Sequence, residues 1–350
     1  MKVLYAVHHA QHLPRHEFTG GALIPAFDSP ERAEAISDAL KQAGGFYLTE
    51  PDDYGLEPIL AVHSRDYVDF LKVAFDDWKA GGLIESPMAS NLAGRPKGPE
   101  PENIEGRVGF FANACDTTID RGTWEAAYAS AQSALGAARH VGSGKANTAF
   151  ALCRPPGHHC EADRFGGYCY LNNAAIAAQH LRNMGLPRVG ILDLDFHHGN
   201  GTQAIFQDRA DVWYGSVHGD PRHCYPFFSG HADEIGRGAG QGATMNLPLP
   251  PGTGNADWLL AVRRMVEALT KFAADAVVVS FGTDPHRDDP QSFFAVDEAG
   301  FAGAAELLRA AGLPCVVVQE GGYCPEALVS CGLAFLDRLQ IPTGRKDERP

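Results

Sequence analysis

Polar side chains that could bind a metal ion follow an apolar stretch near the middle of this sequence. Residues 189–194 are typical of a buried strand, and Asp193, Asp195 and His197 occupy every second position at its end. Because strand side chains alternate between two faces, we expect these three to point the same way. Buried charge is costly unless a cation compensates it, and carboxylate oxygen with imidazole nitrogen suits Zn²⁺ or Fe²⁺. The stretch therefore predicts a metal site, the alternative being a solvated strand end with incidental acids.

A third candidate ligand follows a second apolar strand, predicted over residues 276–281. Asp284 comes three residues after that strand, and together with Asp195 and His197 it would provide three protein ligands. Three protein ligands, with a fourth position left for water, are the pattern of a catalytic zinc site. A metal held in this way polarises a carbonyl group and makes water a better nucleophile. The residue types therefore point to hydrolysis.

A histidine pair and a tyrosine could complete that chemistry. His158 and His159 end a proline-rich turn at 154–159 and are candidates for proton transfer. Tyr323 follows Glu-Gly-Gly and could donate a hydrogen bond to a developing oxyanion. Taken singly, each has a plainer interpretation: a histidine pair in a turn can be solvated at the surface, and a turn tyrosine can simply pack.

Alternating helices and strands are expected to bring these groups together. The sequence predicts strands at 2–7, 148–153, 189–194, 212–218, 276–281 and 315–319, and helices at 30–44, 65–80, 124–141, 174–184, 257–272 and 297–311. Residues 8–28 lack periodicity and are expected to form a loop. The alternation indicates an α/β fold with a parallel sheet covered by helices on both faces. Such sheets bind ligands beyond the carboxyl ends of their strands, where the candidate side chains stand.

Composition and charge narrow the class of protein. The chain has 350 residues and a formal net charge of −14, and we expect one domain over 1–340 with a polar tail at 341–350. The acidic balance argues against nucleic-acid binding, and it suits a small cationic substrate as well as it suits charge that serves only solubility. No apolar run is long enough to span a membrane, and residues 1–9 lack the long apolar region with a small-residue cleavage site that is typical of a signal peptide, so we expect a cytoplasmic protein. The eight cysteines include no Cys-x-x-Cys pair, which fits reduced thiols in the cytoplasm.

The stretch at 83–104 differs from the rest of the chain because Gly, Pro, Ser and Asn dominate it. A structureless segment of this length in a compact domain is usually functional or disordered. No second composition follows it, so we interpret it as a functional loop rather than a linker between domains.

Four ordered motifs resemble those of the histone deacetylase superfamily, and within it those of the bacterial acetylpolyamine amidohydrolases. They are Arg154-Pro-Pro-Gly-His-His159, Phe165-Gly-Gly-Tyr-Cys-Tyr-Leu-Asn-Asn173, Asp193-Leu-Asp-Phe-His-His-Gly-Asn-Gly-Thr202 and Glu320-Gly-Gly-Tyr323. The resemblance covers nearly the whole chain and implies the arginase–deacetylase fold, an α/β domain with a mainly parallel, eight-stranded sheet. It implies Zn²⁺, or alternatively Fe²⁺, on Asp195, His197 and Asp284, with hydrolysis of an acetylated amine as the reaction.

The same resemblance assigns roles to the other polar side chains. His159 would act as general base and then as general acid, with His158 as its electrostatic partner, and Tyr323 would bind the oxyanion. Asp193 would orient His158 and fix its tautomer. Many relatives have Asp where this chain has Asn200. A neutral partner stabilises an imidazolium less than a carboxylate does, so His159 should be the more easily deprotonated here.

The resemblance also implies a substrate tunnel, a potassium site and a dimer. Gly167, Tyr168 and Tyr225 match tunnel positions, where two aromatic rings flank a linear aliphatic chain. Glu17 and Glu105 match acidic positions at the mouth of the pocket. A structural K⁺ would be held by side-chain and main-chain oxygens of Asp193, Asp195, His197, Ser216 and Val217. The loop at 83–104 would help to build a homodimer.

Three alternatives remain open on the same scaffold. A protein deacetylase acting on acetyl-lysine would use identical chemistry, but the acidic balance, Glu17, Glu105 and the long loop favour acetylputrescine- or acetylcadaverine-like substrates. A two-metal ureohydrolase needs further acidic ligands, and Gly199 and His286 stand at the positions where these would occur. A non-enzymatic binding protein would be expected to lack a ligand or the tyrosine, and all are present in this chain.

Overall fold

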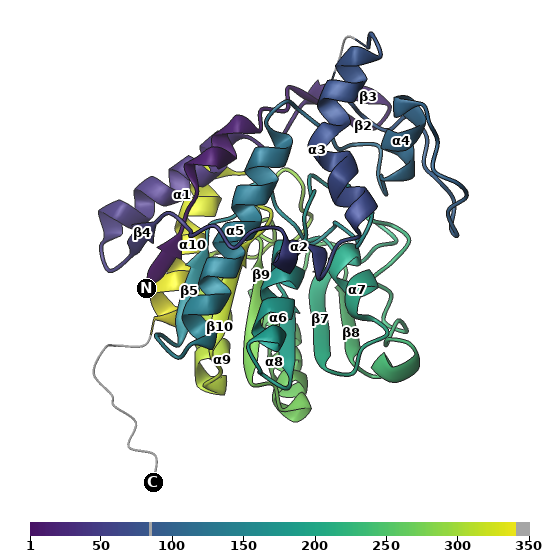
Figure 1. Ribbon diagram of the computed structural model, residues 1–350. Helices are drawn as coiled ribbons and strands as arrows, with labels where there is room; N and C mark the ends of the chain where they lie inside the picture. The colour runs from purple at the N-terminus through teal and green to yellow at the C-terminus, as the bar shows by residue number, and fades with distance from the viewer. Residues whose placement is uncertain (84–85, 341–350) are drawn as a thin grey trace.

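A sheet of eight strands runs through the centre of the molecule in the computed structural model, which describes residues 1–83 and 86–340 (Figure 1). The strand order is β4-β1-β5-β10-β9-β6-β7-β8, and every neighbouring pair is parallel. The bounds are β1 (Lys2–Leu4), β4 (Tyr47–Thr49), β5 (Thr148–Ala151), β6 (Val189–Asp193), β7 (Val212–Gly219), β8 (Thr244–Leu249), β9 (Ala276–Phe281) and β10 (Cys315–Gln319). The predicted α/β architecture with an eight-stranded parallel sheet is confirmed.

Helices cover both faces of this sheet. One face packs against α1 (Pro30–Ala43), α8 (Asn255–Phe272), α9 (Glu298–Ala311) and α10 (Pro325–Leu339). The other face packs against α5 (Thr123–Gly142), α6 (Asn173–Asn183) and α7 (Asn200–Phe206). A third apolar cluster joins α2 (Glu57–Leu60), α3 (Arg65–Ala80) and α4 (Ile104–Phe110) to the loops around 165–171. None of the described helices is long and apolar enough to cross a lipid bilayer.

The composition of the strands explains why both faces are covered. All six residues of β9 are buried, with Val277, Val279 and Phe281 facing one core and Ala276 and Val278 facing the other. A parallel sheet buried on both faces needs continuous apolar strands rather than alternating ones. The polar residues are therefore displaced to the strand ends, where they can gather into a site.

The segment 8–28 departs from the sequence-based prediction. It is not a loop: it contains a 3-10 helix, η1 (Val7–Gln11), and an antiparallel hairpin of β2 (His16–Thr19) and β3 (Ala22–Pro25). Gly20 and Gly21 make the hairpin turn with φ of 60° and 83°, values that favour glycine. A four-residue strand with mixed polarity gives too weak a periodic signal to be recognised in the sequence. The predicted strand at 2–7 ends earlier, at Leu4.

The loop at 83–104 is fastened to its own chain. Lys97 pairs with Asp163 at 2.7 Å, and Arg164 donates to the carbonyl oxygens of Ala93 and Gly94 at 3.0 Å each. The described part of the loop thus lies against the turn at 161–164 and leads into α4, which projects from the body of the domain (Figure 1). The predicted polar tail at 341–350 lies outside the described residues.

Candidate active site

Four neighbouring strands carry the candidate chemistry at their carboxyl ends. The strands β5, β10, β9 and β6 lie side by side in that order. The turn with the histidine pair follows β5, Tyr323 follows β10, Asp284 follows β9, and Asp195 and His197 follow β6. Because the strands are parallel, their ends meet at one edge of the sheet. Segments more than 150 residues apart in the sequence therefore meet in one place.

Asp195, His197 and Asp284 form a compact cluster whose nearest donor atoms all lie within 4.8 Å of one another. His197 Nδ1 is 3.3 Å from Asp195 Oδ1 and 3.1 Å from Asp284 Oδ2. The other carboxylate oxygens are held by main-chain groups: the N–H of Gly321 donates to Asp195 Oδ2 and that of Phe196 to Asp284 Oδ1, each at 2.8 Å. Three donor atoms therefore lie close together, and main-chain N–H groups already hold the second oxygen of each carboxylate.

The electrostatics of this cluster fit a divalent cation. Both carboxylates are fully buried, and in the described part of the chain no lysine or arginine pairs with either. Burial, together with Asp195 alongside, raises the pKa of Asp284 to about 8. Burial alone would lower the pKa of His197, but the two carboxylates raise it to about 9. Two carboxylates and an imidazole this close together therefore form a donor set that a divalent cation would stabilise.

Glycines make the space for these carboxylates. A Cβ at Gly282 would lie 2.1 Å from Asp195 Oδ2, and one at Gly321 would lie 2.5 Å from Asp284 Oδ2. Real Cβ contacts are never this short, so larger residues would displace the two donor groups. The cradle and the set of two carboxylates and one imidazole match a zinc or iron(II) site.

The two histidines of the turn have opposite charge preferences. His158 Nδ1 lies 3.1 Å from Asp193 Oδ2, and its Nε2 lies 3.7 Å from Asp195 Oδ1. Burial alone would lower the pKa of His158, but Asp195 and Asp193 raise it to about 10. Burial and the neighbouring His158 and His197 instead hold the pKa of His159 well below its usual value. One imidazole is therefore cationic at neutral pH and the other is neutral.

Asn200 fixes the tautomer of His159. Its Oδ1 lies 2.7 Å from His159 Nδ1, and its amide nitrogen lies 3.4 Å from the carbonyl oxygen of His159. Because the amide oxygen can only accept, Nδ1 must carry the proton. The lone pair of the neutral ring is therefore on Nε2, where a general base needs it.

A cavity of about 400 Å³ opens above this cluster and is lined by Phe18, Thr19, Gly20, Asp116, His159, Gly167, Tyr168, His197, Cys224, Tyr225, Phe227, Gln291 and Tyr323. Tyr168 and Tyr323 meet edge to face with ring centroids 5.7 Å apart, and Tyr225 packs against His159 at 4.8 Å. A Cβ at Gly167 would lie 2.4 Å from the His159 ring, so the narrow passage requires glycine there. The predicted tunnel residues Gly167, Tyr168 and Tyr225 thus lie together.

Tyr323 is held in place from several sides. Its peptide N–H donates to Asp289 Oδ2 at 2.6 Å, and the guanidinium of Arg32 lies 4.6 Å from the centre of its ring. Arg32 also donates to the carbonyl oxygen of Gly322 at 2.6 Å. Burial raises the pKa of the Tyr323 phenol well above its usual value. The hydroxyl is therefore protonated and can donate a hydrogen bond into the cavity.

The two acidic residues predicted at the mouth are not found there in a single chain. Glu17 is 1% exposed and accepts hydrogen bonds from Tyr168 Oη at 2.8 Å and from the N–H of Phe27 at 3.0 Å. Strand alternation in β2 turns Phe18 toward the cavity and Glu17 away from it. Glu105 is exposed in the first turn of α4 and does not line the cavity.

Asp116 is the carboxylate that does line the cavity, and sequence reasoning missed it. Its Oδ1 accepts a hydrogen bond from Thr117 Oγ1 at 2.6 Å and one from the N–H of Gly167 at 3.3 Å. Burial raises the pKa of this carboxyl group. Asp116 stands in an irregular segment with no periodicity, so no sequence signal distinguishes it from an ordinary surface acid.

The residues predicted to hold potassium also lie together. Asp193 pairs with Ser216 in the register of β6 and β7, and Val217 follows directly. Asp193, Ser216 and Val217 are fully buried. Asp193 is further held by Tyr214 Oη at 3.2 Å and by the N–H of Asp195 at 3.2 Å. The neighbourhood is rich in oxygen atoms, as a hard monovalent cation requires.

Comparisons with known proteins identify the family to which the chain belongs. A family model described as the histone deacetylase domain matches residues 26–339. The acetylpolyamine amidohydrolase of Mycoplana ramosa is 44% identical over 324 residues, covering 92% of this chain and 95% of that protein. An acetylpolyamine amidohydrolase of Burkholderia pseudomallei is 46% identical over 328 residues, covering 93% and 94%.

A solved structure has the same fold over nearly all of the chain. The crystal structure of an acetylpolyamine aminohydrolase from Burkholderia pseudomallei superposes with a TM-score of 0.93 at 42% identity, covering 97% of this chain and 98% of that one. The family match and these similarities extend over nearly all of the chain. The chain is therefore a hydrolase of amide bonds that belongs to the histone deacetylase family.

Proposed function

We propose that this protein is a zinc-dependent amidohydrolase that removes the acetyl group from small acetylated diamines and polyamines of the acetylputrescine and acetylcadaverine type. The observation that carries the proposal is the buried cluster of Asp195, His197 and Asp284 at the base of a narrow cavity that also contains Asp116. The similar proteins from Mycoplana ramosa and Burkholderia pseudomallei are named acetylpolyamine amidohydrolases, which supports the same substrate class.

The metal would be held by Asp195, His197 and Asp284, with Zn²⁺ as the first candidate and Fe²⁺ as the second. When bound, it would polarise the acetyl carbonyl group and lower the pKa of a nearby water molecule. A structural K⁺ is part of the proposal, since Asp193, Ser216 and Val217 supply closely spaced oxygen atoms on β6 and β7.

His159 would move the protons. Its Nε2 would take a proton from the attacking water and later give it to the departing amine, because that nitrogen carries the lone pair in the tautomer set by Asn200. His158 stays cationic between Asp193 and Asp195, so it stabilises negative charge that develops beside it. The two histidines therefore divide acid–base and electrostatic work between them.

Tyr323 would donate a hydrogen bond from its phenolic hydroxyl to the carbonyl oxygen as negative charge develops there. Its raised pKa keeps the donor protonated, and Arg32 and Asp289 fix the ring and the main chain. Tyr168 and Tyr225 would flank the aliphatic chain of the substrate. Asp116 would then attract a distal ammonium group, with Glu17 acting indirectly by fixing the hydroxyl of Tyr168.

A homodimer would complete the mouth of this tunnel. Phe18 and Phe227 line the cavity and are 44% and 51% exposed, and the neighbouring Phe228 is 92% exposed. A second copy could cover them and bring Glu105 and the loop at 83–104 to the opening. Sedimentation of the wild type and of Phe228→Ser tests this: the wild type should be dimeric and the variant should dissociate more readily. A wild type that is monomeric at micromolar concentration would exclude the dimer.

The two-metal alternative gains no support from the site. A Cβ at Gly199 would lie 2.3 Å from Asp193 Oδ2 and 2.7 Å from Tyr214 Oη, and the glycine itself offers no side-chain ligand. His286 points toward Glu298 of α9, with Nε2 3.9 Å from the carboxylate. One metal per chain is therefore expected, and a measured ratio of two would revive the alternative.

The proposal is tested by a turnover panel of N-acetylputrescine, N-acetylcadaverine, acetylspermidine and an acetyl-lysine peptide. The diamines should have the highest kcat/KM, because the cavity is narrow and Asp116 lies within it. Faster turnover of the peptide would move the assignment to a protein deacetylase. Failure on every acetylated amine would exclude the proposed chemistry.

A further inference from the structure

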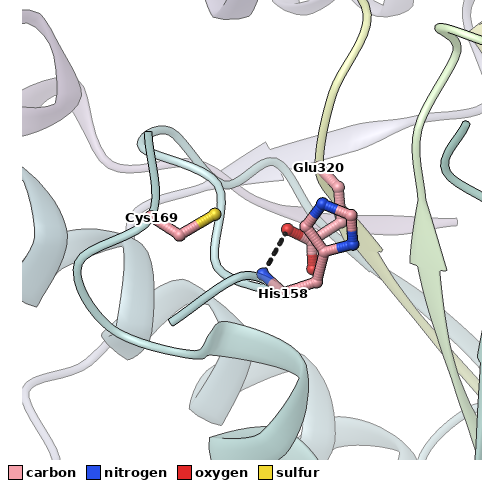
Figure 2. A group of neighbouring side chains, drawn as sticks. All are labelled: His158, Cys169 and Glu320. Carbon is pink, nitrogen blue, oxygen red and sulfur yellow. Dashed lines mark hydrogen bonds between the residues drawn. The ribbon is translucent and has the colours of Figure 1, made fainter. Parts of the chain in front are cut away.

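A buried carboxylate behind the histidine pair has no role in the chemistry described above. Glu320 follows the last residue of β10 and is fully buried. Figure 2 shows its carboxylate between the thiol of Cys169 and the imidazole of His158, with the peptide nitrogen of His158 directed at it. One donor atom of each of these three side chains lies within 4.8 Å of the others.

The contacts of Glu320 fix it firmly between three strand ends. Oε2 accepts from the N–H of Gly157 at 2.7 Å and from that of His158 at 3.1 Å, while Oε1 accepts from Ser280 Oγ at 3.1 Å. Its own N–H donates to the carbonyl oxygen of Phe281 at 2.8 Å. The side chain thus connects the turn after β5 to the ends of β9 and β10.

The turn depends on an acceptor at this position. Pro155 and Pro156 have no N–H groups. The first main-chain N–H donors of the turn after Arg154 are therefore those of Gly157 and His158. Gly157 is packed so closely that a Cβ would lie 2.4 Å from the nitrogen of Asn173. Buried N–H groups without a partner are strongly unfavourable. One oxygen of Glu320 satisfies both.

Cys169 gives no reason to interpret the group as a metal site. Its thiol donates to the carbonyl oxygen of Gly167 at 3.2 Å. The Glu320 carboxylate already accepts three hydrogen bonds. The group is therefore a hydrogen-bonded support behind the active site.

We infer that Glu320 is a positioning residue, which holds the main chain of the Gly157–His158 turn so that the imidazoles of His158 and His159 face the reacting groups. Their alignment is narrow: His158 Nδ1 lies 3.1 Å from Asp193 Oδ2 and His159 Nδ1 lies 2.7 Å from Asn200 Oδ1. A displacement of about 1 Å at such groups costs on the order of 10²-fold in rate. The kinetic part of this inference rests on the proposed role of His159 as the base.

Two substitutions separate geometry from charge. Glu320→Gln keeps the reach and an acceptor oxygen but removes the charge, and its amide can donate to Ser280 Oγ. Glu320→Asp keeps the charge but is shorter by one methylene, so it cannot reach both N–H groups. We expect Glu320→Gln to keep kcat within about threefold. Glu320→Asp should lower kcat by roughly 10²-fold while KM changes by less than about twofold.

A matched control removes the other contact of the same carboxylate. Ser280→Ala eliminates the hydrogen bond to Oε1 and leaves both bonds to the turn intact. It should therefore keep kcat near that of the wild type. Equal losses in Ser280→Ala and Glu320→Asp would indicate general damage to the core and would overturn the inference. The reverse order, with Glu320→Asp active and Glu320→Gln inactive, would show that charge matters instead.

Crystal structures of the variants give a readout that does not depend on activity. In Glu320→Asp the distances from His158 Nδ1 to Asp193 Oδ2 and from His159 Nδ1 to Asn200 Oδ1 should lengthen, and in Glu320→Gln they should not. Unchanged distances in Glu320→Asp would overturn the inference. If the wild type hydrolyses no acetylated amine, the proposed function fails, while these distances still decide the role of Glu320.

Discussion

The base of the cavity and its rim are built on different principles. The base comprises Asp195, His197, Asp284, His158 and His159, all buried at strand ends and all hydrogen-bonded within one chain. The rim comprises Phe18 and Phe227, with Phe228 directly after Phe227 in the sequence, and it presents exposed apolar rings. One region is complete in a single chain, and the other leaves apolar surface uncovered.

This difference separates the reaction from the choice of substrate. Groups at the base are fixed by the parallel sheet, so any member of the family that retains them should hydrolyse acetyl amides by the same chemistry. Groups at the rim come from short hairpins and loops, which tolerate insertion and change far more readily. Substitutions at the base should therefore affect kcat strongly, and substitutions at the rim should affect KM modestly and selectively.

The largest expected effect comes from the metal ligands. Asp284→Asn should lower both metal content and activity to background, because a neutral amide is a poorer ligand than a carboxylate. Chelation of the wild type should have the same effect, and Zn²⁺ or Fe²⁺ should restore activity. Metal per chain and turnover are measured together, with the exposed Asp288→Asn in the same loop as the control. Full activity in a metal-free preparation would contradict the site.

Loss of the base should come next. His159→Ala should lower kcat by about 10²–10⁴-fold, the usual size of a lost general base, while metal content is retained. The control is His140→Ala, a partly exposed histidine on α5 outside the cavity. A variant at 159 with near wild-type kcat would assign the proton transfer to another group.

Tyr323→Phe should have a somewhat smaller effect. It removes one donor to the developing oxyanion, which is worth on the order of 10²–10³-fold in kcat. The ring and its contact with Arg32 remain, so KM and thermal stability should change little. Tyr47→Phe, at a ring that is 71% exposed, serves as the control. If both variants behave like the wild type, Tyr323 does not bind the oxyanion.

Asn200→Asp should shift the pH dependence rather than abolish activity. A carboxylate beside Nδ1 favours the imidazolium and raises the pKa of His159, which burial otherwise holds well below its usual value. Because the base must be neutral, the acidic limb of kcat/KM should move to higher pH, with activity lost first at low pH. The profile of kcat/KM against pH checks this, and an unmoved limb would show that His159 does not set it.

Asp116, which lines the wall of the cavity, should give the smallest and most selective effect. Asp116→Asn should raise KM for acetylputrescine by roughly five- to tenfold, as for an ion pair worth about 1 kcal/mol, and leave an uncharged N-alkyl acetamide unaffected. Glu17→Gln should change KM for both substrates equally, because Glu17 acts through the hydroxyl of Tyr168. If Glu17→Gln instead raised KM for acetylputrescine but not for the uncharged amide, Glu17 would contact the ammonium group after all.

Much of the base could be predicted from the sequence, because its signals are local. Apolar runs of five or six residues identify the strands, and polar residues directly after such runs must stand at strand ends. Asp193, Asp195 and His197 alternate in register after one such run, which indicates a metal site without knowledge of any other segment. The parallel arrangement follows from the alternation of helices and strands. The expected roles of His158, His159 and Tyr323 came from the resemblance of four motifs to those of a known family.

Only the tertiary structure decided which of the remaining polar groups face the cavity. The hairpin of β2 and β3 turns Phe18 inward and Glu17 away, and a shift of one residue would exchange them. Asp116 reaches the cavity because a segment without periodicity packs against the Gly167 turn. Glu320 supports the histidine pair 162 residues away because β10 lies beside β5. These contacts depend on strand order and packing between distant segments, which no local pattern in a single sequence records.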